Sequence, residues 1–168
     1  MLEALGNMGD FVGGIGVVAT LIYLAVQIRQ NTRAMKMASR QEIVAGARDW
    51  NRMFLDPRIA AAYERGLQAY PEIDAEAHAQ FRSVMHDLAL FMQGAFAMWE
   101  SGALEDETYR AYLDFFVSHL GTVGGAAWWD TARPIYMSRM VASFDDRLRQ
   151  GVPEMPLALI WAATASGD

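Results

Sequence analysis

The chain of 168 residues contains no cysteine, which excludes disulfides, iron–sulfur clusters, thiol catalysis and zinc sites built on cysteine. An excess of basic charge is also absent, because 14 Lys and Arg stand against 20 Asp and Glu and give a net charge of −6. Such an acidic chain is a poor ligand for nucleic acid unless its basic residues cluster. Hydrophobic residues, by contrast, make up 53% of the chain, so we expect a packed core rather than disorder.

One uncharged apolar run stands near the start of the chain. Residues 11–28, FVGGIGVVATLIYLAVQI, carry no charge between Asp10 and Arg29. As a helix they extend about 27 Å, close to the thickness of a bilayer's hydrocarbon core. The run predicts a membrane-spanning helix, with a buried helix of a soluble domain as the alternative. A cleaved signal peptide fits less well, because Glu3 but no Lys or Arg precedes the run and no clear small-residue cleavage site follows it.

The charges on either side of this run predict its orientation. Glu3 and Asp10 precede it, and four cations that we call the basic collar follow it: Arg29, Arg33, Lys36 and Arg40. Positive flanks stay cytoplasmic, so we expect a single-pass protein of the plasma (inner) membrane, with its N-terminus outside and the rest in the cytoplasm. Anionic lipid headgroups at the membrane surface explain the collar without nucleic acid, although it also fits a solvated helix face.

Small residues recur along the predicted membrane helix at three- and four-residue steps. This register places Gly6, Gly9, Gly13, Gly16 and Thr20 on one side, and we call Gly9, Gly13, Gly16 and Thr20 the small face. Small residues let helix backbones approach closely in lipid, so we expect another helix to pack there, from a second copy or from another membrane protein. The abundance of glycine in membrane helices is the simpler explanation.

The rest of the chain shows helical periodicity and no convincing strand pattern. The first helix is predicted to run to about Phe54. Further helices are expected over residues 57–69, 74–101, 105–120 and 137–149, with a short helical turn at Trp128 and Trp129. We therefore predict an all-α protein in which a single N-terminal transmembrane helix continues into an antiparallel helical bundle. Its regions are an anchor and collar (1–36), a cytoplasmic bundle (37–151) and an apolar tail (152–168).

The chain offers little recognisable chemistry. It lacks an HExxH pair, a nucleophile elbow and a phosphate loop, so no catalytic residue, metal site or cofactor is predicted. On helical wheels His86 points outward, His78 lies at a margin, and His119 is the histidine expected to be buried and hydrogen-bonded. Asp74 and His78 share a face, which a capping role for Asp74 explains equally well.

Three tryptophans are candidates for the core or for contact with a partner: Trp128, Trp129 and Trp161. For the adjacent pair, Trp128 and Trp129, the core is favoured over an interfacial anchor or a ligand wall. Trp161 lies in the uncharged run 157–165, LALIWAATA, which is too short to span a membrane. Three placements of this tail fit the sequence: packing on its own domain, lying at the membrane surface, or docking on a partner.

Several segments of the chain together resemble segments of known proteins. LIYLAVQIRQNTRAM after a glycine-rich start, DPRIAAAYERGL, ESGALEDETY and AAWWDTARPIY resemble a group of uncharacterised bacterial proteins with one N-terminal membrane helix and a small all-helical domain. The resemblance covers about residues 8–147 and leaves the tail outside. It implies the architecture and supplies no activity.

From these patterns we predict a non-catalytic accessory or structural subunit of a larger membrane assembly. Its expected partners are membrane lipids and either other membrane subunits or a second copy. The alternative is a self-associating, membrane-tethered helical domain that binds a small apolar ligand such as a lipid, quinone or pigment. The third hypothesis is a membrane-tethered enzyme. Such an enzyme would need a bound metal or a pocket that brings His119 together with Asp114 or Glu100.

Overall fold

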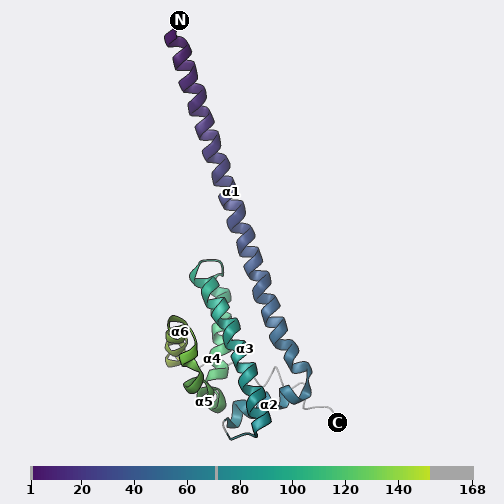
Figure 1. Ribbon diagram of the computed structural model, residues 1–168. Coiled ribbons are helices and arrows are strands. Elements are labelled where there is room, and N and C mark those ends of the chain that lie inside the picture. Colours follow the sequence, from purple (N-terminus) through teal and green to yellow (C-terminus); the bar gives the residue numbers. More distant parts are fainter. Residues whose placement is uncertain (1, 71, 152–168) are drawn as a thin grey trace. The chain divides into compact units, whose positions relative to one another are not determined.

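A computed structural model describes residues 2–70 and 72–151 of the chain, and within them the side chains from Gly13 onward. Its helices are, in chain order, α1 (Leu2–Arg52), α2 (Pro57–Ala69), α3 (Ala75–Glu100), α4 (Asp106–Leu120), α5 (Val123–Ala132) and α6 (Ser138–Arg149) (Figure 1). Two short 3₁₀ turns, η1 (Met53–Leu55) and η2 (Arg133–Ile135), separate some of them. No strand occurs in the described residues, and the predicted all-α fold is confirmed.

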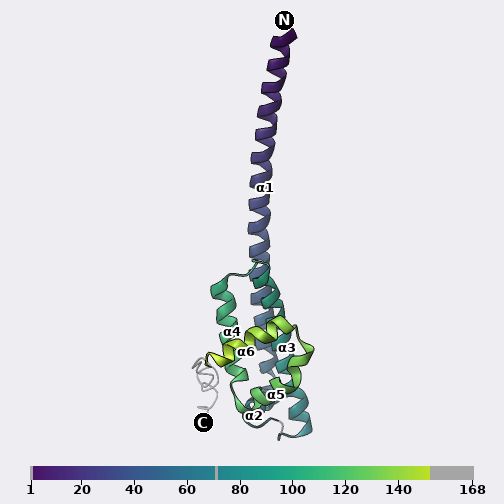
Figure 2. The ribbon, with the colours of Figure 1, turned by 90° about the vertical axis from the view of Figure 1, so that its left-hand side faces the viewer.

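The chain divides into two compact units, residues 1–40 and 41–168. The first unit holds α1 up to Arg40, and the second holds the last turns of α1 with all later helices. In the second unit α3 and α4 run antiparallel and pack side by side, as predicted, and α6 lies across α4 (Figure 2). The boundary expected at residue 36 stays a prediction, and the tail 152–168 lies outside the described residues.

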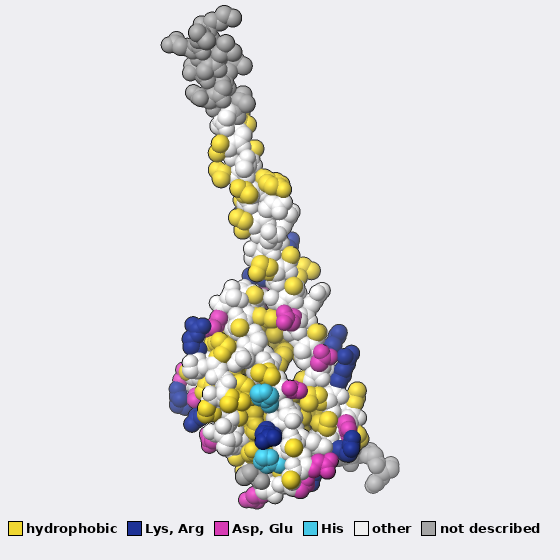
Figure 3. Space-filling view, viewed as in Figure 1, with side chains coloured by type: hydrophobic (Ala, Val, Ile, Leu, Met, Phe, Trp, Pro, Cys, Tyr) yellow, Lys and Arg dark blue, Asp and Glu magenta, His cyan; other side chains and the backbone are white. Residues whose placement is uncertain are grey.

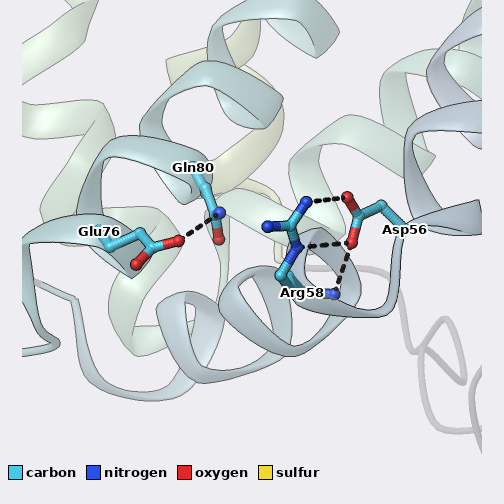
Figure 4. A network of polar contacts seen from close by, with 4 residues as sticks. All are labelled: Asp56, Arg58, Glu76 and Gln80. Carbon is cyan, nitrogen blue, oxygen red and sulfur yellow. Dashed lines mark hydrogen bonds and ion pairs between the residues drawn. The ribbon is translucent and has the colours of Figure 1, made fainter.

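The short polar side chain of Asp56 caps the start of α2. The carboxylate of Asp56 accepts the backbone N–H of Arg58 at 2.9 Å, one residue after Pro57 opens α2. It also pairs with the Arg58 guanidinium, while Glu76 and Gln80 pair on the first turns of α3 (Figure 4). The hydrogen bonds that the guanidinium and the backbone N–H of Arg58 donate to Asp56 favour its charged form. The pKa of Asp56 therefore lies below its usual value of 3.8. Such caps satisfy N–H groups that the helix leaves without partners.

The core of the second unit is built from the apolar faces of its helices. On α3 this face buries Phe81, Val84, Met85, Leu88, Met92, Ala95 and Phe96. Trp99, near the end of α3, is half-buried; its indole N–H donates to Asp106 at 2.8 Å and its ring stacks on Tyr109. Phe116 from α4 and Phe144 from α6 meet with ring centroids 5.0 Å apart. The helices are therefore joined by large side chains in direct contact.

One crossing in this core depends on glycine. A Cβ atom on Gly124 of α5 would lie 1.7 Å from the carbonyl oxygen of Gly66 on α2. A Cβ atom on Gly66 would lie 2.2 Å from the ring of Phe81. Because backbone and a buried ring occupy these positions, α2 and α5 approach this closely only without side chains.

The Gly124→Ala substitution should therefore lower the free energy of unfolding by about 3 kcal/mol, since an added methyl forces two packed backbones apart. Gly94→Ala is the matched control, because no atom lies within 4 Å of its added Cβ. In the middle of α3 it should raise stability by about 0.5–1 kcal/mol. Denaturant unfolding of the full chain in detergent, followed by tryptophan fluorescence, measures both. Equal effects of the two substitutions would contradict this view of the crossing.

Candidate functional site

Between Gly13 and the start of the basic collar at Arg29, α1 exposes apolar side chains. Ile15, Leu21, Ile22 and Tyr23 are each 54–62% exposed. Figure 3 shows hydrophobic side chains along α1 and charges of both signs over the helices of the second unit. By length and composition α1 is the one helix in the described residues that is able to cross a membrane. Exposed apolar surface of this extent on a helix calls for lipid or protein around it.

Polar groups in this stretch are satisfied inside the helix. The hydroxyl of Thr20 donates to the carbonyl of Gly16 at 2.8 Å, and the amide of Gln27 donates to the hydroxyl of Tyr23 at 3.0 Å. A hydroxyl or amide without a partner in hydrocarbon costs several kcal/mol (about 2–7). These two internal bonds remove that cost and make the stretch compatible with a bilayer.

The small face and the basic collar lie on opposite sides of α1. With about 100° per residue, Gly13, Gly16 and Thr20 fall within a sector of roughly 60°. The four collar residues fall within a second sector of similar width, roughly 160° away. Added Cβ atoms at Gly13 and Gly16 meet nothing within 4 Å, so this face is open in the single chain. Gly9 lies outside the residues whose side chains are described.

His119 is buried, as the sequence predicts. It is 1% exposed, and because a carbonyl only accepts, its Nδ1 donates to the carbonyl oxygen of Phe115 at 2.6 Å. The rings of Trp50 and Tyr63 lie about it at 6.1 and 6.0 Å between centroids. Burial among these rings disfavours the charged imidazole and lowers the pKa of His119 to about 4, against a smaller opposing effect of the Phe115 carbonyl. A neutral histidine on a backbone carbonyl is a structural element of the core.

The outward position predicted for His86 is wrong. His86 is half-buried, and its Nδ1 lies 2.6 Å from the hydroxyl of Tyr136, which comes from the segment between η2 and α6. The helical wheel of α3 alone misses this contact, because Tyr136 is 50 residues away in sequence. His78, predicted at a margin, is half-buried and stacks on Tyr70 at 4.5 Å.

The capping role of Asp74 is confirmed. Its carboxylate accepts the backbone N–H of Ala77 at 2.9 Å and pairs with Arg65 at 3.0 Å. The Ala77 N–H, with a smaller contribution from Arg65, lowers the pKa of Asp74 below 3.8.

The carboxylates considered for catalysis are engaged by arginines. Glu100 pairs with Arg139 at 2.8 Å, and Asp114 pairs with Arg147 at 2.6 Å. Glu100 and Asp114 line a cleft beside α6. His119 is not among the residues that line this cleft, so it does not join Glu100 or Asp114 there. Over the described residues, no group of three or more His, Asp or Glu side chains is placed to hold a metal ion.

The adjacent tryptophans belong to the core, as favoured. Trp128 is 2% and Trp129 3% exposed, and the indole N–H of Trp129 donates to Asp145 at 3.1 Å. Their rings contact each other and Tyr136, so neither is available as a surface anchor. Trp161 lies outside the described residues.

The structure adds one surface that the sequence analysis missed. A groove of about 450 Å³ lies between the last turns of α1 and α3, with Ile43, Trp50, Leu90, Phe91 and Met98 among its apolar lining. The carboxylates of Glu42, Asp49 and Asp87 also line it, and we call it the acidic groove. Gly94, a glycine in the interior of a predicted helix, was the available signal, since such a glycine marks missing side-chain volume.

Comparison with known proteins finds no matching family model, no matching curated protein and no matching solved structure. The resemblance to bacterial proteins with one N-terminal membrane helix therefore stays a prediction, and the function must be argued from the surfaces described above.

The state of His119 makes stability dependent on pH. Its pKa falls from 6.5 in the unfolded chain to about 4 in the fold, so the unfolded chain binds the proton more tightly. Stability should be fully present above pH 6.5 and decline by about 3 kcal/mol as the pH falls to 4. Denaturant unfolding of the full chain at a series of pH values measures the slope.

His119→Phe is the control for this slope, because a phenyl ring keeps the aromatic packing and does not titrate. The caps Asp56 and Asp74 titrate below 3.8 and so lose their contribution at lower pH. The same decline between pH 6.5 and 4 in the Phe variant would assign the effect to other groups.

Proposed function

We propose that this protein is a membrane-anchored accessory subunit, held by α1 and positioning its helical domain at the cytoplasmic surface beside a larger membrane assembly. The observation that carries the proposal is the two-sided character of α1. Gly13, Gly16 and Thr20 offer a side open to close packing, and the basic collar lies on the other side.

This arrangement suits a helix at the edge of an assembly. When the small face packs against a neighbouring helix, the collar on the far side points away from that neighbour. Arg29, Arg33 and Lys36 then face anionic headgroups, at about 1 kcal/mol each near the surface. Thr20 adds no cost to the contact, since its hydroxyl is already bonded to the carbonyl of Gly16.

The helical domain supports a positioning role rather than chemistry. Ion pairs between arginines and carboxylates join α6 to its neighbours, from Arg139 to Glu100 on α3 and from Arg147 to Asp114 on α4. The ring of Trp129 and the N–H bond to Asp145 join α5 to α6. These interactions fix the relative positions of the helices, as a subunit that presents a surface needs.

The absence of cysteine allows the orientation to be tested by labelling single introduced cysteines. Glu3→Cys should react with a membrane-impermeant maleimide in intact cells, because the collar keeps the other end of the helix inside. Ala111→Cys, on an exposed position of α4, should react only after the membrane is opened. The reverse pattern would contradict the orientation, and recovery of the protein in the soluble fraction would contradict the anchor.

Bulk on the small face should release the protein from its assembly. Gly13→Leu and Gly16→Leu place a side chain where a neighbouring backbone is expected, and the added Cβ atoms have no other atom within 4 Å. Extraction in mild detergent should then yield a particle reduced to this chain alone, where the wild type migrates with other subunits. Native mass measurement and identification of the co-migrating proteins give the result.

Gly14→Leu is the matched control, since it adds the same side chain to the same helix, roughly 130° from the centre of the small face. Its added Cβ also meets nothing within 4 Å. A wild-type particle that contains this chain alone, or assembly that survives both small-face substitutions, would overturn the proposal.

The alternative, a tethered domain that binds a small apolar ligand, finds support in one feature. The volume of the acidic groove, about 450 Å³, falls within the usual range for ligand pockets. A lipid, quinone or pigment that remains with the purified protein and is lost when Gly94 is replaced by Leu would favour this function.

A further inference from the structure

The acidic groove is a surface of the helical domain, separate from the small face of α1. One wall is residues 42–52 of α1 with Met53 of η1, and the other is residues 87–98 of α3. Each wall is about 18 Å long, the length of three to four turns of helix. Leu90 is 45% exposed, and Phe91 and Met98 are half-buried. Apolar side chains in the groove are therefore accessible to an occupant.

Glycines determine the shape of the groove. A Cβ on Gly46 would lie 2.8 Å from the ring of Phe91, so α1 and α3 touch at this point. At Gly94 an added Cβ would meet nothing within 4 Å, and Ala95 beside it is also small. The two walls are thus held together by Gly46 and by the bond from the Trp50 indole to the Val84 carbonyl at 3.3 Å, while Gly94 leaves volume unfilled.

The charge of the groove has one sign. Glu42, Asp49 and Asp87 line it, and no Lys or Arg belongs to its lining. Asp49 pairs with Arg52 at 3.0 Å, with both side chains about 70% exposed. Within the described part of the chain Glu42 and Asp87 take part in no ion pair, whereas Glu100, Asp114 and Asp145 each pair with an arginine.

We propose that the acidic groove binds an amphipathic helix of a partner protein, one that carries Lys or Arg beside a stripe of apolar residues. Its apolar stripe would lie over Leu90, Phe91 and the space at Gly94, in the manner of a helix in a hydrophobic groove. Its cations would meet Glu42 and Asp87, which gives the pairing its specificity for charge.

Charge complementarity selects this occupant over others. The chain's own tail, residues 152–168, contains Glu154 and Asp168 and no cation, so the carboxylates of the groove would repel it. A neutral lipid makes no use of three carboxylates, and an anionic lipid is disfavoured by them. A second copy offers its basic collar, but that segment adjoins the apolar run of α1 and is already suited to headgroups.

The test uses the full chain in phosphatidylcholine nanodiscs and a fluorescent designed peptide. The probe is a helix of about four turns with Leu at positions i, i+3, i+4 and i+7 and Lys on both flanks of that stripe. A twin peptide carries Glu in place of each Lys. Fluorescence anisotropy, corrected with empty nanodiscs, should show binding of the Lys peptide and at least about tenfold weaker binding of the Glu twin.

Variants at one position separate filling of the groove from effects on the helix. Gly94→Leu and Gly94→Ala both improve the helix, but only Leu occupies the groove. The Leu variant should weaken binding of the Lys peptide by about tenfold, and the Ala variant should leave it unchanged. Removal of charge by Glu42→Gln with Asp87→Asn should weaken it by about fivefold and flatten its dependence on salt.

Several outcomes would overturn the inference. They are no binding of the Lys peptide, equal binding of the two peptides, or unchanged binding by the Gly94→Leu variant. A mass that falls from two copies to one in that variant, without peptide, would assign the groove to a second copy. Tighter peptide binding after removal of residues 152–168 would assign it to the tail. Because the assay needs no other subunit, its result is independent of the proposed accessory role.

Discussion

The side chain of Trp50 is the contact on which the attachment of α1's last turns to the helical domain depends. It is 7% exposed, and its indole N–H reaches across to the carbonyl of Val84 on α3. Its ring meets Phe54, Phe115 and His119 edge-on, at 4.7, 5.6 and 6.1 Å between centroids. One residue thus joins α1, η1, α3 and α4, buries the histidine with the lowered pKa, and forms part of the wall of the acidic groove.

Periodicity and capping predicted α2, α3, α4 and α6 because both are local properties, whereas α5, which begins at Val123, was expected only as a short turn at Trp128 and Trp129. Asp56 with Pro57 opens α2, and Gly102, at a φ of 73°, follows the end of α3, close to the predicted bounds 57–69 and 74–101. The burial of Phe81, Met85 and Met92 follows from a single helical wheel, and so does the burial of His119 beside an aromatic face. These are properties of a residue and its neighbours four positions away, which the sequence contains directly.

Helical periodicity and capping do not predict contacts between segments that are distant in the sequence. The bond from His86 to Tyr136 joins residues 50 apart, and the contact of Gly66 with Gly124 depends on how two helices cross. The acidic groove is a third case, because it exists only where Gly46 brings α1 against Phe91 while Gly94 leaves space. A single sequence shows that Gly46 and Gly94 are present. Only the packing shows that Phe91 fills the space beside Gly46 and that the space beside Gly94 is open.

A membrane anchor, as proposed, changes the affinity that the acidic groove needs. An open groove of about 450 Å³ with exposed carboxylates is suited to weak binding, since exposed ion pairs contribute only about 0–1 kcal/mol each. Confining the groove and its partner to one membrane makes their encounter effectively intramolecular, with local concentrations on the order of millimolar. A contact too weak to hold two soluble proteins together is then sufficient. A modest groove on a domain with a packed, rigid core is therefore consistent with recognition that depends on anchoring.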